Sequence, residues 1–207
     1  MAASKSGLLL VVSGPAGSGK GTVLSELLGD PAYAYSVSAT TRAPRPGEVD
    51  GVNYYFLDRA AFETRIVNDE MLEYTEYCGN YYGTPRAEAE AVLASGRNLI
   101  LEIEVEGAAN VKRRYPNAVT VMLLPPSFAV QEARLRGRGT ESEEKIRARL
   151  ARTRKEIAQV DNYDYVVYNH DGRSHEAAED IRAIVRAESC RLARNADVAA
   201  RYFDPEQ

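Results

Sequence analysis

Cysteine, tryptophan and long apolar runs are scarce in this sequence. Its 207 residues include two cysteines, three methionines and no tryptophan. Cys78 and Cys190 form neither a Cys-x-x-Cys pair nor a disulfide-rich framework, so we expect a reduced, cytoplasmic protein. The apolar run at residues 8–12 is far shorter than the roughly 20 residues of a membrane span. It is also shorter than the core of a secretory signal, so we expect neither membrane association nor export.

An excess of positive charge is lacking as well. There are 26 Lys and Arg against 30 Asp and Glu, and the net charge of −4 argues against a general nucleic-acid-binding protein. The cations are nevertheless concentrated, because nine of the 26 fall between Arg134 and Lys155. A mildly acidic chain with such a stretch suits a compact anionic ligand. A solvated helix face with Glu–Arg pairs is the simpler explanation of such a run.

The apolar segments indicate strands that alternate with helices. Residues 8–12 form a continuous apolar run followed by a glycine-rich turn, as in a strand buried on both faces. Further strands are expected at 99–105, 119–124 and 165–168. Helices are expected at 22–28, 85–94, 108–114, 128–136, 143–160 and 176–194. This alternation predicts a three-layer α/β domain with a central parallel sheet, its core formed by residues 1–35, 85–130 and 156–194.

Two segments interrupt this alternation. Residues 36–84 hold six of the 13 tyrosines and several prolines and glycines, which predicts a small β-rich insertion of short strands and turns. Residues 131–155 contain a glycine-rich break between two arginine-rich helical segments, which predicts a helical lid over a site. Residues 195–207 are expected to form a helix remnant and a frayed tail.

A glycine-rich loop after the first strand has the spacing of a P-loop, Gly-x-x-x-x-Gly-Lys. The candidate ATP-binding residues in it are Gly14, Pro15, Ala16, Gly17, Ser18, Gly19, Lys20, Gly21 and Thr22. Backbone N–H groups of such a loop surround a phosphate, while the next helix and the lysine add positive charge. We expect Mg²⁺ as cofactor because the phosphate charge must be neutralised. Gly21 stands where a hydroxyl residue usually faces the metal, which leaves Thr22 as a candidate ligand.

The insertion carries a long and specific motif. Between residues 40 and 56 it contains Thr40, Thr41, Arg42, Arg45, Glu48, Gly51, Tyr54, Tyr55 and Phe56. These types at these intervals closely resemble the signature of guanylate kinases, and the stretches 79–84 and 136–141 and Asn169 extend the resemblance to about residues 8–190. The resemblance implies a P-loop fold with a GMP-binding insertion. It also implies transfer of the γ-phosphoryl group of ATP to GMP, giving ADP and GDP in purine nucleotide metabolism.

The side chains of the insertion suit the phosphate of a nucleoside monophosphate. Arg42 and Arg45 can grip a phosphate through planar guanidinium forks, and the hydroxyls of Tyr54 and Tyr82 can complete its coordination. The resemblance also places Glu48 in the GMP site. Packing of a small domain is the simpler role of either tyrosine.

A carboxylate can distinguish guanine from adenine, because guanine offers an N1–H and an N2 amine side by side. The resemblance implies that Glu73 reads this edge, that Ser38 and Thr84 bind O6, and that Glu104 is a second base-reading acid. Glu102 is expected on the same side of a strand as Glu104 and near the metal. Both glutamates stand where the family typically has aspartates, so their distances to magnesium and guanine are left open.

Stabilisation of charge is expected to dominate catalysis, because the acceptor phosphate is already an anion and needs no strong base. Lys20 would act on the donor, and Arg42 and Arg45 on the acceptor. The resemblance adds Arg138 and Arg149 as catalytic lid arginines. It also implies that Arg134 lies over the adenine and that Asn169 belongs to the ATP site. The oligomeric state is left open.

Alternatives exist for single residues and for the whole chain. Thr84 before Pro85 is a good helix N-cap, and an isolated glutamate such as Glu73 is usually solvated. The Gly-Lys-Gly-Thr ending of the P-loop also resembles adenylate kinases, so another nucleoside monophosphate is one alternative acceptor. A non-catalytic guanylate kinase-like domain that binds a phosphorylated peptide is another, although such domains tend to lose a functional P-loop and Lys20 is present.

Overall fold

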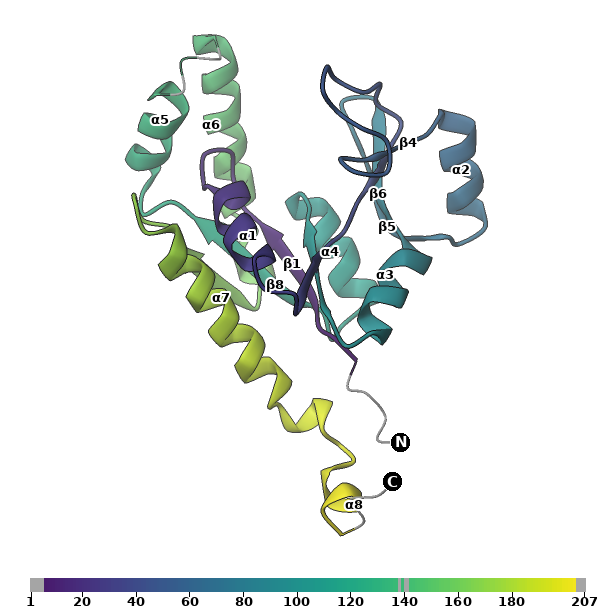
Figure 1. Ribbon diagram of the computed structural model, residues 1–207. Helices are drawn as coiled ribbons and strands as arrows, with labels where there is room; N and C mark the ends of the chain where they lie inside the picture. Colours follow the sequence, from purple (N-terminus) through teal and green to yellow (C-terminus); the bar gives the residue numbers. More distant parts are fainter. Residues whose placement is uncertain (1–5, 138, 140–141, 204–207) are drawn as a thin grey trace.

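A five-stranded sheet forms the centre of the molecule in the computed structural model, which describes residues 6–137, 139 and 142–203 (Figure 1). Across the sheet the strands are β2 (Tyr33–Tyr35), β7 (Asn98–Glu102), β1 (Leu9–Ser13), β8 (Val119–Leu124) and β9 (Tyr165–Tyr168). All neighbouring strands are parallel. The α/β class with a central parallel sheet is therefore confirmed, and β2 is a strand that the sequence analysis did not anticipate.

Helices cover both faces of this sheet, which explains why β1 is apolar throughout. Leu10 and Val12 share a core with α1 (Lys20–Leu28) and α7 (Ser174–Ser189). Leu9 and Val11 share a second core with α3 (Arg86–Ala94) and α4 (Val105–Arg114). Because successive side chains of a strand point to opposite faces, one apolar run fills both cores.

The insertion forms a second, four-stranded sheet with one helix. Its strands, in order across the sheet, are β4 (Tyr55–Phe56), β3 (Ala39–Thr40), β6 (Asn80–Pro85) and β5 (Met71–Tyr77). The helix α2 (Arg59–Val67) packs on this sheet through Phe62, whose ring centroid lies 5.2 Å from that of Tyr81. Short strands were expected here, whereas α2 was missed. Its signals were Asp58, which caps the helix at Ala61, and the apolar pair Phe62 and Ile66 one turn apart.

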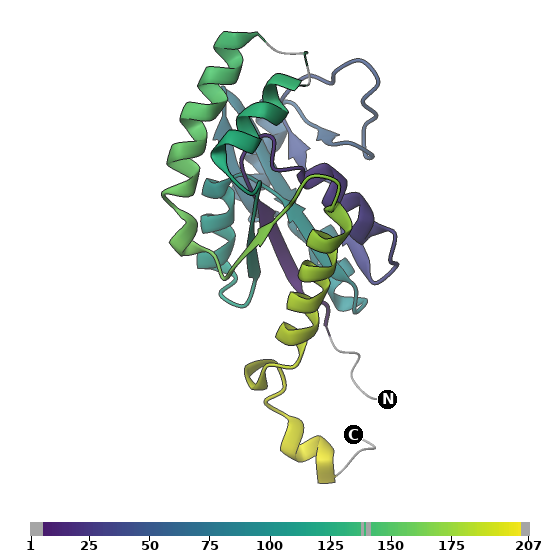
Figure 2. The same cartoon turned by 90° about the vertical axis from the view of Figure 1, so that its left-hand side faces the viewer.

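Helices α5 (Phe128–Gly137) and α6 (Glu143–Ile157) form a hairpin beside the P-loop (Figures 1 and 2). Leu135, Ile146 and Leu150 make a small core that contacts Ala16 of the loop. Gln131 donates to the Ala16 carbonyl at 2.8 Å and to the Thr153 hydroxyl at 2.7 Å. The segment expected to be a lid is thus helical and is anchored to the P-loop at its base.

Several boundaries differ from the expectations. The strand expected at 99–105 ends at Glu102, because Glu104 is the N-cap of α4 and Val105 is already helical. The helix expected at 143–160 ends at Ile157, and a 3-10 turn (Val160–Asn162) follows it. The helix expected at 176–194 spans Ser174–Ser189, with a 3-10 turn at Leu192–Arg194.

The C-terminal segment extends away from the central sheet as a short helix, α8 (Val198–Phe203) (Figures 1 and 2). The side chains of α8 are exposed. Among the described residues, no helix combines the length and the apolar character that a membrane crossing requires.

Candidate functional site

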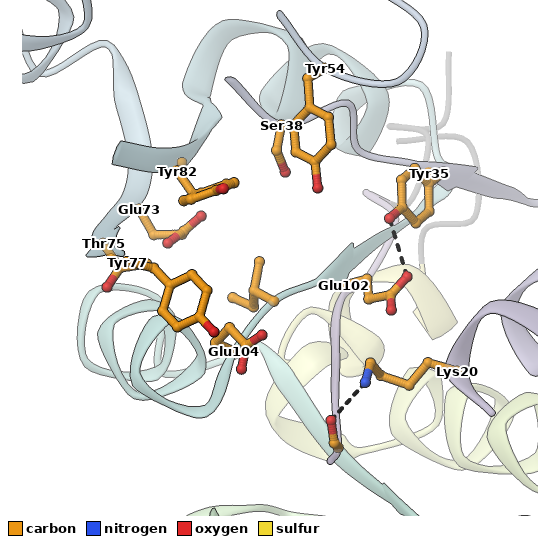
Figure 3. Close-up of a pocket in the computed structure, with 13 residues that line it drawn as sticks. Lys20, Tyr35, Ser38, Tyr54, Glu73, Thr75, Tyr77, Tyr82, Glu102 and Glu104 are labelled. Carbon is orange, nitrogen blue, oxygen red and sulfur yellow. Dashed lines mark hydrogen bonds between the residues drawn. The ribbon is translucent and has the colours of Figure 1, made fainter. Parts of the chain in front are cut away.

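A cavity of about 350 Å³ lies between the P-loop and the four-stranded sheet of the insertion. Gly14 and Lys20 line it from the P-loop (Figure 3). Most of the expected GMP residues line the same cavity, namely Ser38, Tyr54, Glu73, Tyr82 and Glu104. The structure therefore brings the phosphate loop and the proposed base-reading groups into one space, although they come from segments far apart in the chain.

The P-loop is shaped to receive a phosphate. Lys20 Nζ donates to the Gly14 carbonyl at 2.6 Å, so the amine lies across the loop. Gly19 has a φ of +86°, and a Cβ there would lie 2.2 Å from Asn169 Nδ2, so only glycine fits this position without a shift. The Ser18 hydroxyl is buried and has no hydrogen-bond partner among the residues that the structure describes. An unpaired buried group at this point suits a site that a phosphate completes.

Arg134 and Asn169 support the P-loop from the side of α5 and β9. Asn169 Nδ2 donates to the Ser18 carbonyl at 2.8 Å. Arg134 donates to the Gly17 carbonyl at 3.2 Å and to the Asn169 carbonyl at 2.8 Å, and it pairs with Asp171 at 2.6 Å. Both residues therefore lie next to the loop, as expected for the ATP site, while their contact with ATP stays a prediction.

Thr22 and Glu102 were the candidate metal ligands. Thr22 is exposed in the first turn of α1, and Glu102 lines the cavity at the end of β7, where Tyr35 Oη donates to Glu102 Oε2 at 3.3 Å. Within the described part of the chain, no group of three or more His, Cys, Asp or Glu side chains could hold a metal. One carboxylate beside a phosphate loop nevertheless fits Mg²⁺, which kinases bind through one or two carboxylates, substrate phosphates and water.

Arg42 is held in place by Glu48. The two side chains form a bidentate pair with both N–O distances at 2.9 Å, and Glu48 also accepts from the Arg45 backbone N–H at 2.7 Å. The hydrogen bonds that Arg42 donates to Glu48 lower the pKa of Glu48, and the same bonds raise the pKa of Arg42. The Arg42 guanidinium lies 5.4 Å from the ring centroid of Tyr54, a wall of the cavity. Arg45 lies in the exposed turn beside it.

Glu73 is a buried carboxyl group that faces the cavity. Its residue is 4% exposed, and the Thr84 hydroxyl donates to Glu73 Oε1 at 3.0 Å. Burial raises the pKa of Glu73 to about 7, although hydrogen bonds from Thr84 oppose the rise. The alternative of a solvated Glu73 is therefore wrong. The N-cap alternative for Thr84 is wrong as well, because Pro85 is the N-cap of α3 and the Thr84 hydroxyl binds Glu73.

Glu102 and Glu104 both line the cavity, but they do not share a strand as expected. Glu102 ends β7, and Glu104 lies beyond it with the extended backbone of a helix N-cap, so the alternation argument does not apply to the pair. Glu104 instead forms an ion pair with Arg152 of α6, with Arg152 Nη2 2.6 Å from Glu104 Oε2.

Sequence reasoning missed several residues of the cavity, namely Tyr35, Thr75, Tyr77 and Ile103. Thr75 and Tyr77 follow Glu73 at intervals of two along β5 and face the same side. The period-two alternation of a strand would have identified them from Glu73. Tyr35 ends β2, and the carboxyl ends of parallel strands are the usual place for ligands, but β2 itself had not been recognised.

The two lid arginines are not tested by the structure. Arg138 lies outside the described residues. Arg149 is exposed on α6, where its backbone carbonyl accepts from the Thr153 hydroxyl at 3.1 Å. Their catalytic role stays a prediction.

Three comparisons with known proteins agree on one family. The family pattern described as guanylate kinase matches residues 6–188. A guanylate kinase of Desulfitobacterium hafniense (strain Y51) is 49% identical over 189 residues, which cover 91% of this chain and 94% of that protein. A guanylate kinase of Halalkalibacterium halodurans is 52% identical over 189 residues, which cover 91% of this chain and 92% of that protein. The crystal structure of guanylate kinase from Anaplasma phagocytophilum matches with a TM-score of 0.73 and 35% identity, covering 92% of this chain and 90% of that one.

Proposed function

Because the chain belongs to the guanylate kinase family and is an enzyme of that family, we propose that it transfers the γ-phosphoryl group of ATP to GMP. The products are ADP and GDP, and we place the reaction in cytoplasmic purine nucleotide metabolism. One observation carries the proposal: the P-loop residues Gly14 and Lys20 line the same cavity as Glu73, Tyr54 and Tyr82. A donor phosphate and an acceptor nucleotide can therefore meet there.

GMP is proposed to bind with its base toward Glu73 and its phosphate toward Arg42. The ionised Glu73 carboxylate accepts from N1–H and the N2 amine, while Ser38 and Thr84 bind O6 and Glu104 adds a second acceptor. Arg42, Arg45, Tyr54 and Tyr82 hold the phosphate, and Glu48 keeps Arg42 in place. Burial and the nearby Tyr82 raise the pKa of Tyr54, so its hydroxyl remains a donor at neutral pH.

The cations of the site lower the activation barrier of phosphoryl transfer, because they hold the anionic phosphates of ATP and GMP close together. Lys20 holds the phosphates of ATP within the P-loop, and Arg45 stabilises charge on the acceptor side. The lid residues Arg138 and Arg149 close over the transferring group and exclude water. Mg²⁺, when bound, neutralises phosphate charge, and Glu102 and Thr22 are the proposed protein groups that hold it.

A coupled assay tests the proposal. The purified protein is given ATP and Mg²⁺ with GMP, AMP, UMP or dTMP in turn, and ADP formation is measured. We expect turnover with GMP only. Turnover with AMP instead would favour another nucleoside monophosphate kinase, and no turnover with any acceptor would favour a binding module.

The variant Glu73→Gln tests the assignment of the base reader. The amide presents an N–H₂ group to the donors of guanine, so the KM for GMP should rise by roughly 10²-fold. The KM for ATP should stay unchanged, because Glu73 lies on the wall of the insertion. A rise in the KM for ATP without one for GMP would contradict the assignment.

A further inference from the structure

Arg152 of the lid helix α6 contacts the guanine end of the cavity. Its Nη2 lies 2.6 Å from Glu104 Oε2, and its Nε donates to Glu156 Oε1 at 2.8 Å. The guanidinium carbon lies 4.6 Å from the centroid of the Tyr77 ring. Tyr77 and Glu104 both line the cavity, where Figure 3 shows them together. One side chain thus joins α6, the start of α4 and the end of β5.

These contacts fix the position of the guanidinium. Glu156 lies one turn along the same helix, and its side chain is 10% exposed, so the carboxylate of this pair is sheltered from solvent. The guanidinium carbon lies over the Tyr77 ring in cation–π contact. An exposed ion pair alone has little effect, but a guanidinium held by a buried carboxylate and a ring is preorganised toward its second carboxylate.

Glu104 depends on Arg152 for its orientation. The Glu104 side chain is 51% exposed, and among the described residues Arg152 is the one hydrogen-bond partner of its carboxylate. The bond engages Oε2 and leaves Oε1 to accept from a ligand in the cavity. Without Arg152, the carboxylate at the N-terminus of α4 would have no side chain to hold it against the wall.

We propose that Arg152 is a positioning residue that orients Glu104 to accept from the N2 amine of guanine. The inference rests on the proposed function, which places GMP in this cavity. It makes Arg152 a determinant of the preference for GMP over a purine monophosphate that lacks the amine. Inosine monophosphate is such a ligand, because it keeps N1–H, O6, ribose and phosphate and differs from GMP at that amine alone.

Calorimetric binding of GMP and inosine monophosphate to the full-length protein tests the proposal. Arg152→Met keeps the aliphatic stem and removes the guanidinium, and it should weaken GMP binding roughly tenfold while changing inosine monophosphate binding by less than about twofold. Glu104→Gln should give the same pattern, and the double variant should add no further loss. Arg152→Lys keeps the charge but cannot bridge both carboxylates, so its preference should fall between those of the wild type and Arg152→Met.

Arg147→Met is the matched control on the same helix. Arg147 is 76% exposed, pairs with Glu143 and is absent from the cavity wall, so both affinities should stay at the wild-type values. Thermal unfolding of every variant checks that it is folded.

The outcomes separate this inference from the proposed function. If Arg152→Met weakened the binding of GMP and of inosine monophosphate equally, or left the preference for GMP unchanged, the role of Arg152 would be overturned. GMP phosphorylation by the wild type would still stand. A wild type without any preference for GMP would also overturn the role of Arg152, because Glu104 would then not read the amine. Failure of the wild type to phosphorylate GMP would instead refute the proposed function itself.

Discussion

At the scale of residues, a buried carboxyl group and several positively charged side chains lie around the same cavity. Glu73 lies on strand β5 of the insertion, where burial raises its pKa, whereas Arg42 and Lys20 lie toward the phosphates that the site would bind. A base-reading acid needs a dry pocket, because an unpaired polar edge then discriminates strongly between bases. Phosphate-binding cations need accessible donors. The two kinds of group are therefore placed in different environments.

The raised pKa of Glu73 predicts a pH-dependent stability. The carboxyl group has an ordinary pKa of 4.5 and a folded-state pKa of about 7, so folding favours its protonated form. Its stabilising contribution is then fully present below pH 4.5 and is lost as the pH rises through about 7. The free energy of unfolding, measured with urea between pH 4.5 and pH 7.5, should fall as the pH rises. In Glu73→Gln this dependence on pH should be weaker. Parallel curves for the two proteins would contradict the raised pKa.

The exposed Arg45 predicts a variant that loses activity without losing stability. Arg45→Met should lower the turnover of GMP by roughly 10²- to 10⁴-fold, because one charged donor to the acceptor phosphate is removed. The melting temperature should stay unchanged, since the side chain is exposed. Arg65→Met on α2 of the same insertion is the control, and it should retain turnover. Near-normal turnover of Arg45→Met would refute the assigned role.

At the scale of elements, α4 shows how a helix can be adapted to the site that it borders. Gly107 lies in its first turn without a positive φ, so no turn geometry requires glycine there. A Cβ at this position would lie 3.3 Å from Glu73 Oε2 and 3.4 Å from Ile103 Cδ1. Glycine lowers helix stability by about 1 kcal/mol relative to alanine. Its presence is explained by the space that the Glu73 carboxylate occupies.

Gly107→Ala should therefore separate stability from GMP binding. Alanine favours the helix, so the melting temperature should stay the same or rise, while the displaced Glu73 carboxylate should raise the KM for GMP several-fold. The KM for ATP should not change. Steady-state kinetics with each substrate varied, together with thermal unfolding, measures all three. A loss of stability with unchanged kinetics would indicate that Gly107 serves packing alone.

At the scale of the whole molecule, the site and helix α8 lie at opposite ends of the central sheet (Figure 1). Helix α8 is exposed, whereas Arg194 just before it pairs with the buried Glu188 at 3.0 Å and donates to the Asn117 carbonyl at 2.7 Å. The boundary between the folded core and the tail is therefore expected immediately after this arginine.

Truncation tests this boundary. A chain that ends at Asn195 should keep the melting temperature and the turnover of the full chain, because residues 196–203 of the lost segment are exposed. A chain that ends at Ala193 also loses Arg194 and Asn195, and the weakened support of Glu188 by Arg194 should lower the free energy of unfolding by about 1–3 kcal/mol. Chemical unfolding of both chains measures the difference. Equal stabilities would place the boundary earlier in the chain.

Several structural features of this protein are determined by the local sequence. The apolar run at β1 specifies a strand with two covered faces, the P-loop spacing specifies a turn that only glycines can make, and the motif around Arg42 and Glu48 lies within one short turn. These features depend on neighbours within a few residues. Strand periodicity would also have supplied Thr75 and Tyr77.

Only the tertiary structure decided how distant segments share one cavity. The burial of Glu73, the space at Gly107 and the bond from Arg152 to Glu104 join residues that are tens of positions apart in sequence. The scarcity of cysteine predicted a reduced protein, and the arginine-rich stretch suited a compact anionic ligand. They could not show that Arg152 pairs with Glu104 at the wall of the cavity, because burial and orientation arise from the packing of elements rather than from the pattern within one of them.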